Sequence, residues 1–203
     1  MAFSPEGRSG ETGGTLEWGV FGGIGKGKVM TAIKEMGLTT EEFLKLKDKG
    51  YLPYDKSIDL VKRIQNVTEK HNPANPEKMI VRDIKDFLEE FLKKKSENVR
   101  FYSALKTPLD IMHGVDAFFE IDLEKEEGKE QQKPVVVTMD ITMRAKEGDK
   151  DQKANVLIRM PDGAPLSADD DYEAKVKQIA RAVKDAFENI KSGDKFFKTA
   201  ITI

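Results

Sequence analysis

Two aspartates in the second half of the chain are the residues best suited to chemistry. Asp116 stands in the run GVDAFFEIDL at 114–123 and Asp140 in the run PVVVTMDITMR at 134–144. Both runs have the alternating polarity and the β-branched and aromatic residues typical of strands. If these strands pair as a hairpin, Asp116, Asp140 and Thr142 come within reach of one divalent cation, and Mg²⁺ prefers such oxygen ligands.

Alternation decides which side chains share a face with the two acids. One face carries Val115, Ala117, Phe119 and Ile121 in the first run, and Val135, Val137, Met139, Ile141 and Met143 in the second. The other face carries Asp116, Phe118, Glu120 and Asp122, then Val136, Thr138, Asp140, Thr142 and Arg144. An antiparallel sheet with one solvated face shows this pattern without any function. A bare charge inside VVVTMDITM is expensive, however, so we expect Asp140 to have a partner.

Further strands and helices are expected around these two runs. The predicted strands are 99–104, 114–123, 134–144, 153–160 and a last one in KFFKTAITI, and amphipathic helices are predicted over 76–95 and from about 167 to 190. The charged connectors EKEEGKEQQK and AKEGDKDQ are interpreted as hairpin loops, so the simplest connection is a meander. The expected fold class is α+β, with a mostly antiparallel meander flanked by helices.

The N-terminal third has a different character. Residues 1–27 are rich in Gly, Ser and Thr and predict an irregular or partly disordered arm, on which Trp18 and Phe21 could meet a protein partner. Residues 28–72 have helical periodicity and predict a helical extension, and HNPANP at 71–76 marks the expected boundary before a domain spanning 77–203.

The order of the elements resembles the PD-(D/E)xK nuclease-like superfamily over roughly residues 77–203. A long helix is followed by a strand, a strand bearing Gly114-Val115-Asp116, and a strand bearing Asp140-Ile141-Thr142. In that family an acidic residue opens the second core strand and an acid-x-Lys motif lies on the third. The resemblance implies a restriction-endonuclease-like core, Mg²⁺ binding and the hydrolysis or binding of nucleic-acid phosphodiesters.

The resemblance also assigns roles to individual residues. Asp116 matches the first acid and Asp140 the second, and a helix acid such as Glu89 or Glu90 matches an additional metal ligand of some members. Thr142 occupies the lysine position. That lysine would orient the attacking water and stabilise negative charge.

The departure at Thr142 leaves two alternatives open. Lys146 or Lys153 could reach the site from outside the motif. Otherwise the chain is a non-catalytic interaction or assembly protein that retains the fold. A third alternative is an unrelated α+β enzyme with a small-molecule pocket away from the two aspartates.

Composition narrows the chemistry further. With 34 basic and 36 acidic side chains the net charge is -2, so a site for a polyanion would have to be local. Cysteine is absent, which excludes disulfides, thiolate metal sites and cysteine nucleophiles. His71 and His113 are the two histidines, and Asp110-x-x-His113-x-x-Asp116 has a spacing that a metal could use. No apolar run spans a bilayer and no signal peptide is evident, so we expect a cytoplasmic protein with no membrane partner.

Overall fold

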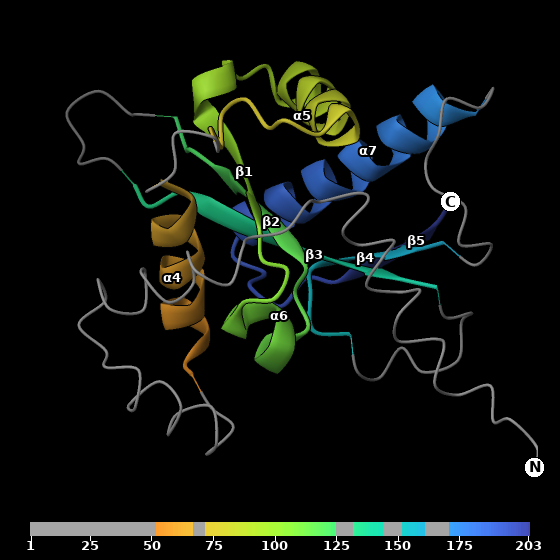
Figure 1. Cartoon of the computed structure of the whole chain (residues 1–203). Helices are drawn as coiled ribbons and strands as arrows, with labels where there is room; N and C mark the ends of the chain where they lie inside the picture. The colour runs from red at the N-terminus through yellow and green to blue at the C-terminus, as the bar shows by residue number, and fades with distance from the viewer. Residues whose placement is uncertain (1–51, 67–71, 125–131, 144–151, 161–170) are drawn as a thin grey trace, which may run out of the picture.

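The computed structural model describes residues 52–66, 72–124, 132–143, 152–160 and 171–203, which form a five-stranded sheet flanked by helices (Figure 1). The fold class is α+β, as predicted. The predicted arm and the first part of the helical extension lie outside these residues. The elements are α4 (Tyr54–Asn66), α5 (Met79–Leu92), η2 (Ser96–Asn98), β1 (Val99–Ser103), α6 (Pro108–His113), β2 (Ala117–Ile121), β3 (Val135–Thr142), β4 (Val156–Arg159), α7 (Tyr172–Lys191) and β5 (Thr199–Thr202).

The sheet is mixed, and its strands lie side by side in sequence order. β1 pairs with β2 and β2 with β3 in antiparallel fashion, but β3 pairs with β4 and β4 with β5 in parallel. The interpretation of AKEGDKDQ as a hairpin loop was therefore wrong. A parallel neighbour requires the chain to return to the end of the sheet at which the previous strand began, and a charged loop does not reveal that direction.

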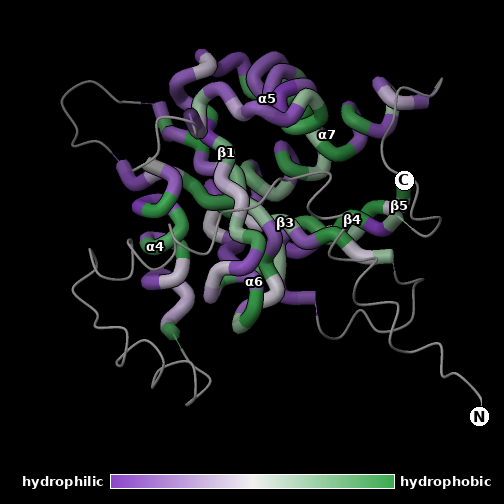
Figure 2. The backbone as a smooth tube through the Cα atoms, in the orientation of Figure 1, coloured by the Kyte–Doolittle hydropathy of each residue, from purple (hydrophilic) through white to green (hydrophobic). Residues whose placement is uncertain are grey.

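Helices α5 and α7 cover one face of the sheet. Both are amphipathic, and α7 alternates hydrophobic and hydrophilic stretches in Figure 2. Their apolar sides pack on the odd-numbered residues of β2 and β3, and the buried members of this core include Ile84, Leu88, Val183, Phe119, Val137 and Met139. Burial of a side chain such as Leu88, which has no exposed surface, stabilises the fold by about 1.5–3 kcal/mol.

Helices α4 and α6 cover the opposite face, which the sequence pattern had suggested to be solvated. Ile58 and Val61 of α4 and Leu109 of α6 pack there against Tyr102 and Phe118. The Phe118 side chain is fully buried, and its ring stacks on that of Tyr102 with centroids 4.9 Å apart. This face therefore carries a second apolar cluster between its polar residues and is not the solvated face that would explain the alternation by itself.

The helix α6 lies between the strands predicted over 99–104 and 114–123, in a stretch for which no helix was predicted. Thr107 caps it by accepting a hydrogen bond from Leu109 N at 3.2 Å, and Pro108 occupies the first turn. Gly114 ends it in the left-handed region, at φ 58°. The strand predicted over 114–123 is shorter in the structure, since β2 begins only at Ala117 and ends at Ile121.

The predicted boundary at 71–76 contains a turn, with a bridge between Asn72 and Asn75. Pro73 O accepts a hydrogen bond from Phe101 N at 2.9 Å, which ties this turn to β1. The division into 28–72 and 77–203 stays a prediction, although α4 packs directly on the sheet. Among the described helices, none has the length and apolarity needed to cross a membrane.

Candidate functional site

Asp116 is attached to β3 on both sides of Asp140. Its backbone N–H donates to Met139 O at 2.9 Å, and its Oδ2 accepts a hydrogen bond from Ile141 N at 2.8 Å. Met139 and Ile141 are the two chain neighbours of Asp140. The structure therefore brings the two predicted acids next to each other, where β2 begins and β3 approaches its end.

The local backbone explains why the Asp116 side chain occupies this position. Ahead of β2 the chain turns toward α6, and Val115 N donates to Leu109 O at 3.4 Å. On the other side, Asp116 O accepts from Ala104 N at 2.7 Å. A buried backbone N–H requires an acceptor, and the Asp116 carboxylate provides it for Ile141 in place of a backbone carbonyl. Asp116 is only 3% exposed, and the hydrogen bond from Ile141 N holds its carboxylate in one orientation.

Asp140 and Thr142 point to the face covered by α4 and α6. They alternate with Met139 and Ile141, which are buried in the core beneath α5 and α7. Asp140 and Thr142 are both half-buried. In the register with β4, Asp140 lies beside Leu157 and Thr142 beside Arg159.

Two cations lie near this pair of acids. Arg159 is 6% exposed and is the last residue of β4. Lys153 is exposed, and its Cδ lies 3.5 Å from the position that a Cβ on Gly114 would take, two residues before Asp116. Lys153 thus lies close to the predicted site, whereas Lys146 falls outside the described residues. Arg159 was missed in the sequence, although it is a charge inside the apolar run NVLIRM.

The helix acids are not brought to the pair. α5 covers the opposite face, and Glu90 on it is exposed while Glu89 is paired with Lys85. Just past the helix, Lys94 acts electrostatically on Asp122, which follows the far end of β2. Glu89 and Glu90 therefore lie across the sheet and toward the other end of β2, because the helix packs with its apolar stripe on the first face.

His113 holds α6 against the segment preceding α4. Its Nε2 is 2.8 Å from Leu52 O, and its ring meets that of Tyr54 edge-on with centroids 5.3 Å apart. The contact spans 61 residues, so His113 links two segments that are far apart in the sequence. Asp110 accepts a hydrogen bond from Lys106 N at 2.7 Å, and this bond stabilises a residue with a φ of 65°.

No metal-binding group of three or more His, Cys, Asp or Glu residues occurs within the described ranges. The Asp110-His113-Asp116 spacing accordingly forms no such group, because the three side chains have different partners. Tyr54 contacts β3 through Thr138. Burial raises the pKa of Tyr54, and a hydrogen bond with Thr138 opposes that shift. Thr138 lies two residues before Asp140 on the same face of β3.

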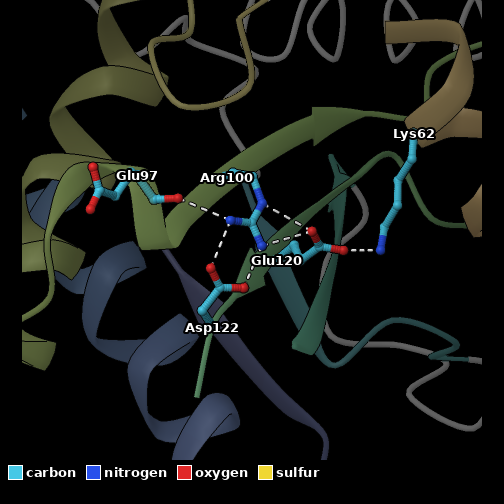
Figure 3. A network of polar contacts seen from close by, with 5 residues as sticks. All are labelled: Lys62, Glu97, Arg100, Glu120 and Asp122. Carbon is cyan, nitrogen blue, oxygen red and sulfur yellow. Dashed lines mark hydrogen bonds and ion pairs between the residues drawn. The ribbon is translucent and has the colours of Figure 1, made fainter. Parts of the chain in front are cut away.

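A second polar cluster joins β1, β2 and α4 at the other end of this face (Figure 3). The Arg100 guanidinium donates to Glu120 Oε1 at 3.0 Å, to Asp122 Oδ2 at 2.8 Å and to Glu97 O at 2.9 Å. Lys62 of α4 forms an ion pair with Glu120 Oε2. Two cations face two carboxylates, so the cluster is neutral and clamps α4 to the sheet.

We expect the Asp122–Arg100 pair to make the fold sensitive to acid. The hydrogen bond from Arg100 lowers the pKa of Asp122 in the folded state, and partial burial opposes it. A depressed carboxyl pKa contributes stability above the unfolded value, near 3.9, and that contribution is lost as pH falls through the lower folded value. In Asp122→Asn, urea midpoints should fall at pH 6 but converge with wild type at the most acid pH. Parallel curves would contradict this role.

The site combines two adjacent carboxylates, one just before β2 and one on β3, with nearby positive charge. Carboxylate oxygens suit a hard divalent cation, and Mg²⁺ commonly uses one or two of them and keeps several waters. Arginine and lysine suit the negatively charged oxygens of a phosphate. Comparisons with known proteins identify no relative: no family model matches the chain, and neither the curated proteins nor the solved structures give a significant match.

Proposed function

We propose that this domain is a Mg²⁺-dependent nuclease-like domain that binds or hydrolyses nucleic-acid phosphodiesters. The observation that carries the proposal is the fixation of Asp116 on both sides of Asp140. Bringing two carboxylates together is unfavourable unless a cation compensates them. A buried, fixed aspartate beside a half-buried one is therefore a suitable place for a divalent metal.

Asp116 and Asp140 would hold the metal. Mg²⁺ in such a site supplies Lewis-acid polarisation of a phosphoryl oxygen and a bound water with a lowered pKa. The chain itself contributes orientation, because the hydrogen bond from Ile141 N fixes the Asp116 carboxylate. Thr142 offers a hydroxyl on the same face of β3, and the exposed Lys153 has its Cδ beside Gly114.

A non-catalytic interaction or assembly protein is the alternative, and specific observations favour it. Thr142 supplies no positive charge at the position where the resemblance expects lysine. In addition, Ile111 is 64% and Phe196 86% exposed, and exposed apolar side chains of this size suit a protein partner. A protein partner of the N-terminal arm remains a prediction, since residues 1–27 lie outside the described ranges.

Calorimetric titration with MgCl₂ and MnCl₂ tests the proposal. We expect the wild type to bind both ions and Asp140→Asn to lose the binding heat, because the substitution removes a charged ligand while conserving shape. Asp185→Asn on the exposed side of α7 is the matched control and should bind as the wild type does. Labelled single- and double-stranded DNA and RNA then reveal cleavage.

The outcomes separate the candidate functions. Metal-dependent cleavage that requires Asp140 supports a nuclease. Binding of metal and nucleic acid without cleavage supports a degenerate, binding member. An absence of metal binding by the wild type at millimolar metal concentration would overturn the proposal and favour the non-catalytic interaction or assembly protein.

A further inference from the structure

We propose that Arg159 is the residue that binds the phosphodiester beside the two aspartates. The inference rests on the proposed function and assigns it a substrate-binding group that the sequence had not indicated. Arg159 would donate hydrogen bonds to a non-bridging phosphate oxygen while the acids hold the metal. Its strand, β4, is separate from the strands that carry Asp116 and Asp140.

The register of the sheet places Arg159 on the correct face. In the parallel pairing of β3 and β4, Thr142 lies beside Arg159, and Ile141 lies beside Ile158. Ile141 and Ile158 are both buried in the core beneath α5 and α7. Because successive side chains of a strand point oppositely, Thr142 and Arg159 share the other face with Asp140.

The distance between Arg159 and the acids suits a long side chain. Asp140 lies beside Leu157, two residues before Arg159 on β4. Diagonal neighbours of this kind have Cα atoms about 7–8 Å apart, which a long side chain spans. The guanidinium is therefore within reach of the Asp140 side of the site.

Burial makes Arg159 unusual among the cations near the site. Arginine is almost never so buried without compensating negative charge, because removing its charge from water is costly. Asp140, two register positions away on the same face, would supply such charge in the proposed site. When a divalent cation neutralises the aspartates, the guanidinium gains affinity for another anion, and its planar donors match two phosphate oxygens.

The described neighbours do not offer an equivalent group. Thr142, beside Arg159, has a short uncharged side chain, and Lys153 is exposed, so solvent screens its charge. Lys85 is the other deeply buried cation of the described chain, but it lies on α5, across the sheet, and donates to Glu89 and to Ser96. Among the residues that the structure describes, Arg159 is thus the buried positive charge on the face of the two acids.

Binding of a short labelled DNA duplex, and of RNA of the same sequence, tests the inference, with Ca²⁺ replacing Mg²⁺ to limit cleavage. A hydrogen bond to a charged group supports an expected loss of affinity of about ten- to a hundredfold in Arg159→Met. The magnitude of the slope of log K against log salt concentration should also decrease by about one, as expected for the loss of one phosphate contact. Arg159→Lys should be intermediate, since it keeps the charge but loses the paired donors.

Three comparisons decide the outcome. Arg82→Met, an exposed change on α5, should bind nucleic acid as the wild type does. Thr142→Lys in the Arg159→Met background should recover part of the affinity, because it returns a cation to the neighbouring register position. Calorimetry with Mg²⁺ should show that Arg159→Met still binds metal.

The failure of this inference can be distinguished from failure of the proposed function. A wild type that binds neither metal nor nucleic acid overturns both. A wild type that binds both, together with an Arg159→Met variant of unchanged affinity and salt slope, overturns only the assignment of Arg159. Loss of affinity accompanied by an unchanged salt slope and no recovery with Thr142→Lys would show a structural role and would also overturn it.

Discussion

Replacing Asp116 with alanine is expected to reduce stability and metal-dependent cleavage together. The buried N–H of Ile141 would lose its charged acceptor, which costs about 1.5–3 kcal/mol. Mutating a residue that only orients a metal ligand typically lowers metal affinity or activity by about 10–100-fold. Removing the ligand itself should therefore lower the cleavage rate by more than about 100-fold. Urea denaturation and cleavage rates measure the two effects.

Asp116→Asn separates these two roles. Its amide oxygen can still accept a hydrogen bond from Ile141 N, so the stability loss should stay below about 1.5 kcal/mol. The substitution removes the negative charge, so the fall in metal binding and cleavage should match that of the alanine variant. Full activity in a stably folded Asp116→Asn protein would show that this acid is structural and not a metal ligand.

The largest loss of stability is expected from Phe118→Ala. Phe118 is fully buried between the sheet and α4, and its ring stacks on Tyr102. Truncating a buried phenylalanine leaves a cavity and typically costs about 3–5 kcal/mol. The free energy of unfolding, obtained by denaturant titration, measures this loss.

Phe196→Ala is the matched control, because it makes the same chemical change at a side chain that is 86% exposed. It should change the free energy of unfolding by no more than about 0.5 kcal/mol. Equal losses in the two variants would mean that the cluster beneath α4 contributes little. Such a result would contradict the packing described for the second face.

The sequence predicted the type of most described elements because their periodicities are strong. The stripes of α5 and α7 and the alternation of β3 are examples, and the order of helices and strands followed from them. The missed helix α6 is too short for periodicity, yet Thr107-Pro108 and Gly114 were local signals for its start and end. The parallel pairing of β4 depends on tertiary packing, which local patterns do not encode.

Prediction of the candidate site was less complete. Strand pairing correctly implied that Asp116 and Asp140 are neighbours. The sequence did not predict the turn before β2, which allows the Asp116 carboxylate to accept a hydrogen bond from Ile141 N. Glu90 was misplaced because helix periodicity does not say which face of a sheet the helix covers. Arg159 carried the same signal that had singled out Asp140, a charge within an apolar strand.

The mixed pairing of the sheet also bears on the order in which the fold assembles. Residues 122–134 join β2 to β3, whereas residues 160–198, about three times as many, separate β4 from β5. Closing the longer segment costs about 1 kcal/mol more in chain entropy by the logarithmic scaling of loop closure, before α7 contributes any packing. β5 also has half of its side chains exposed. The antiparallel β1–β3 region is therefore suited to form early, and β5 is the strand expected to join last and to detach first when the domain opens.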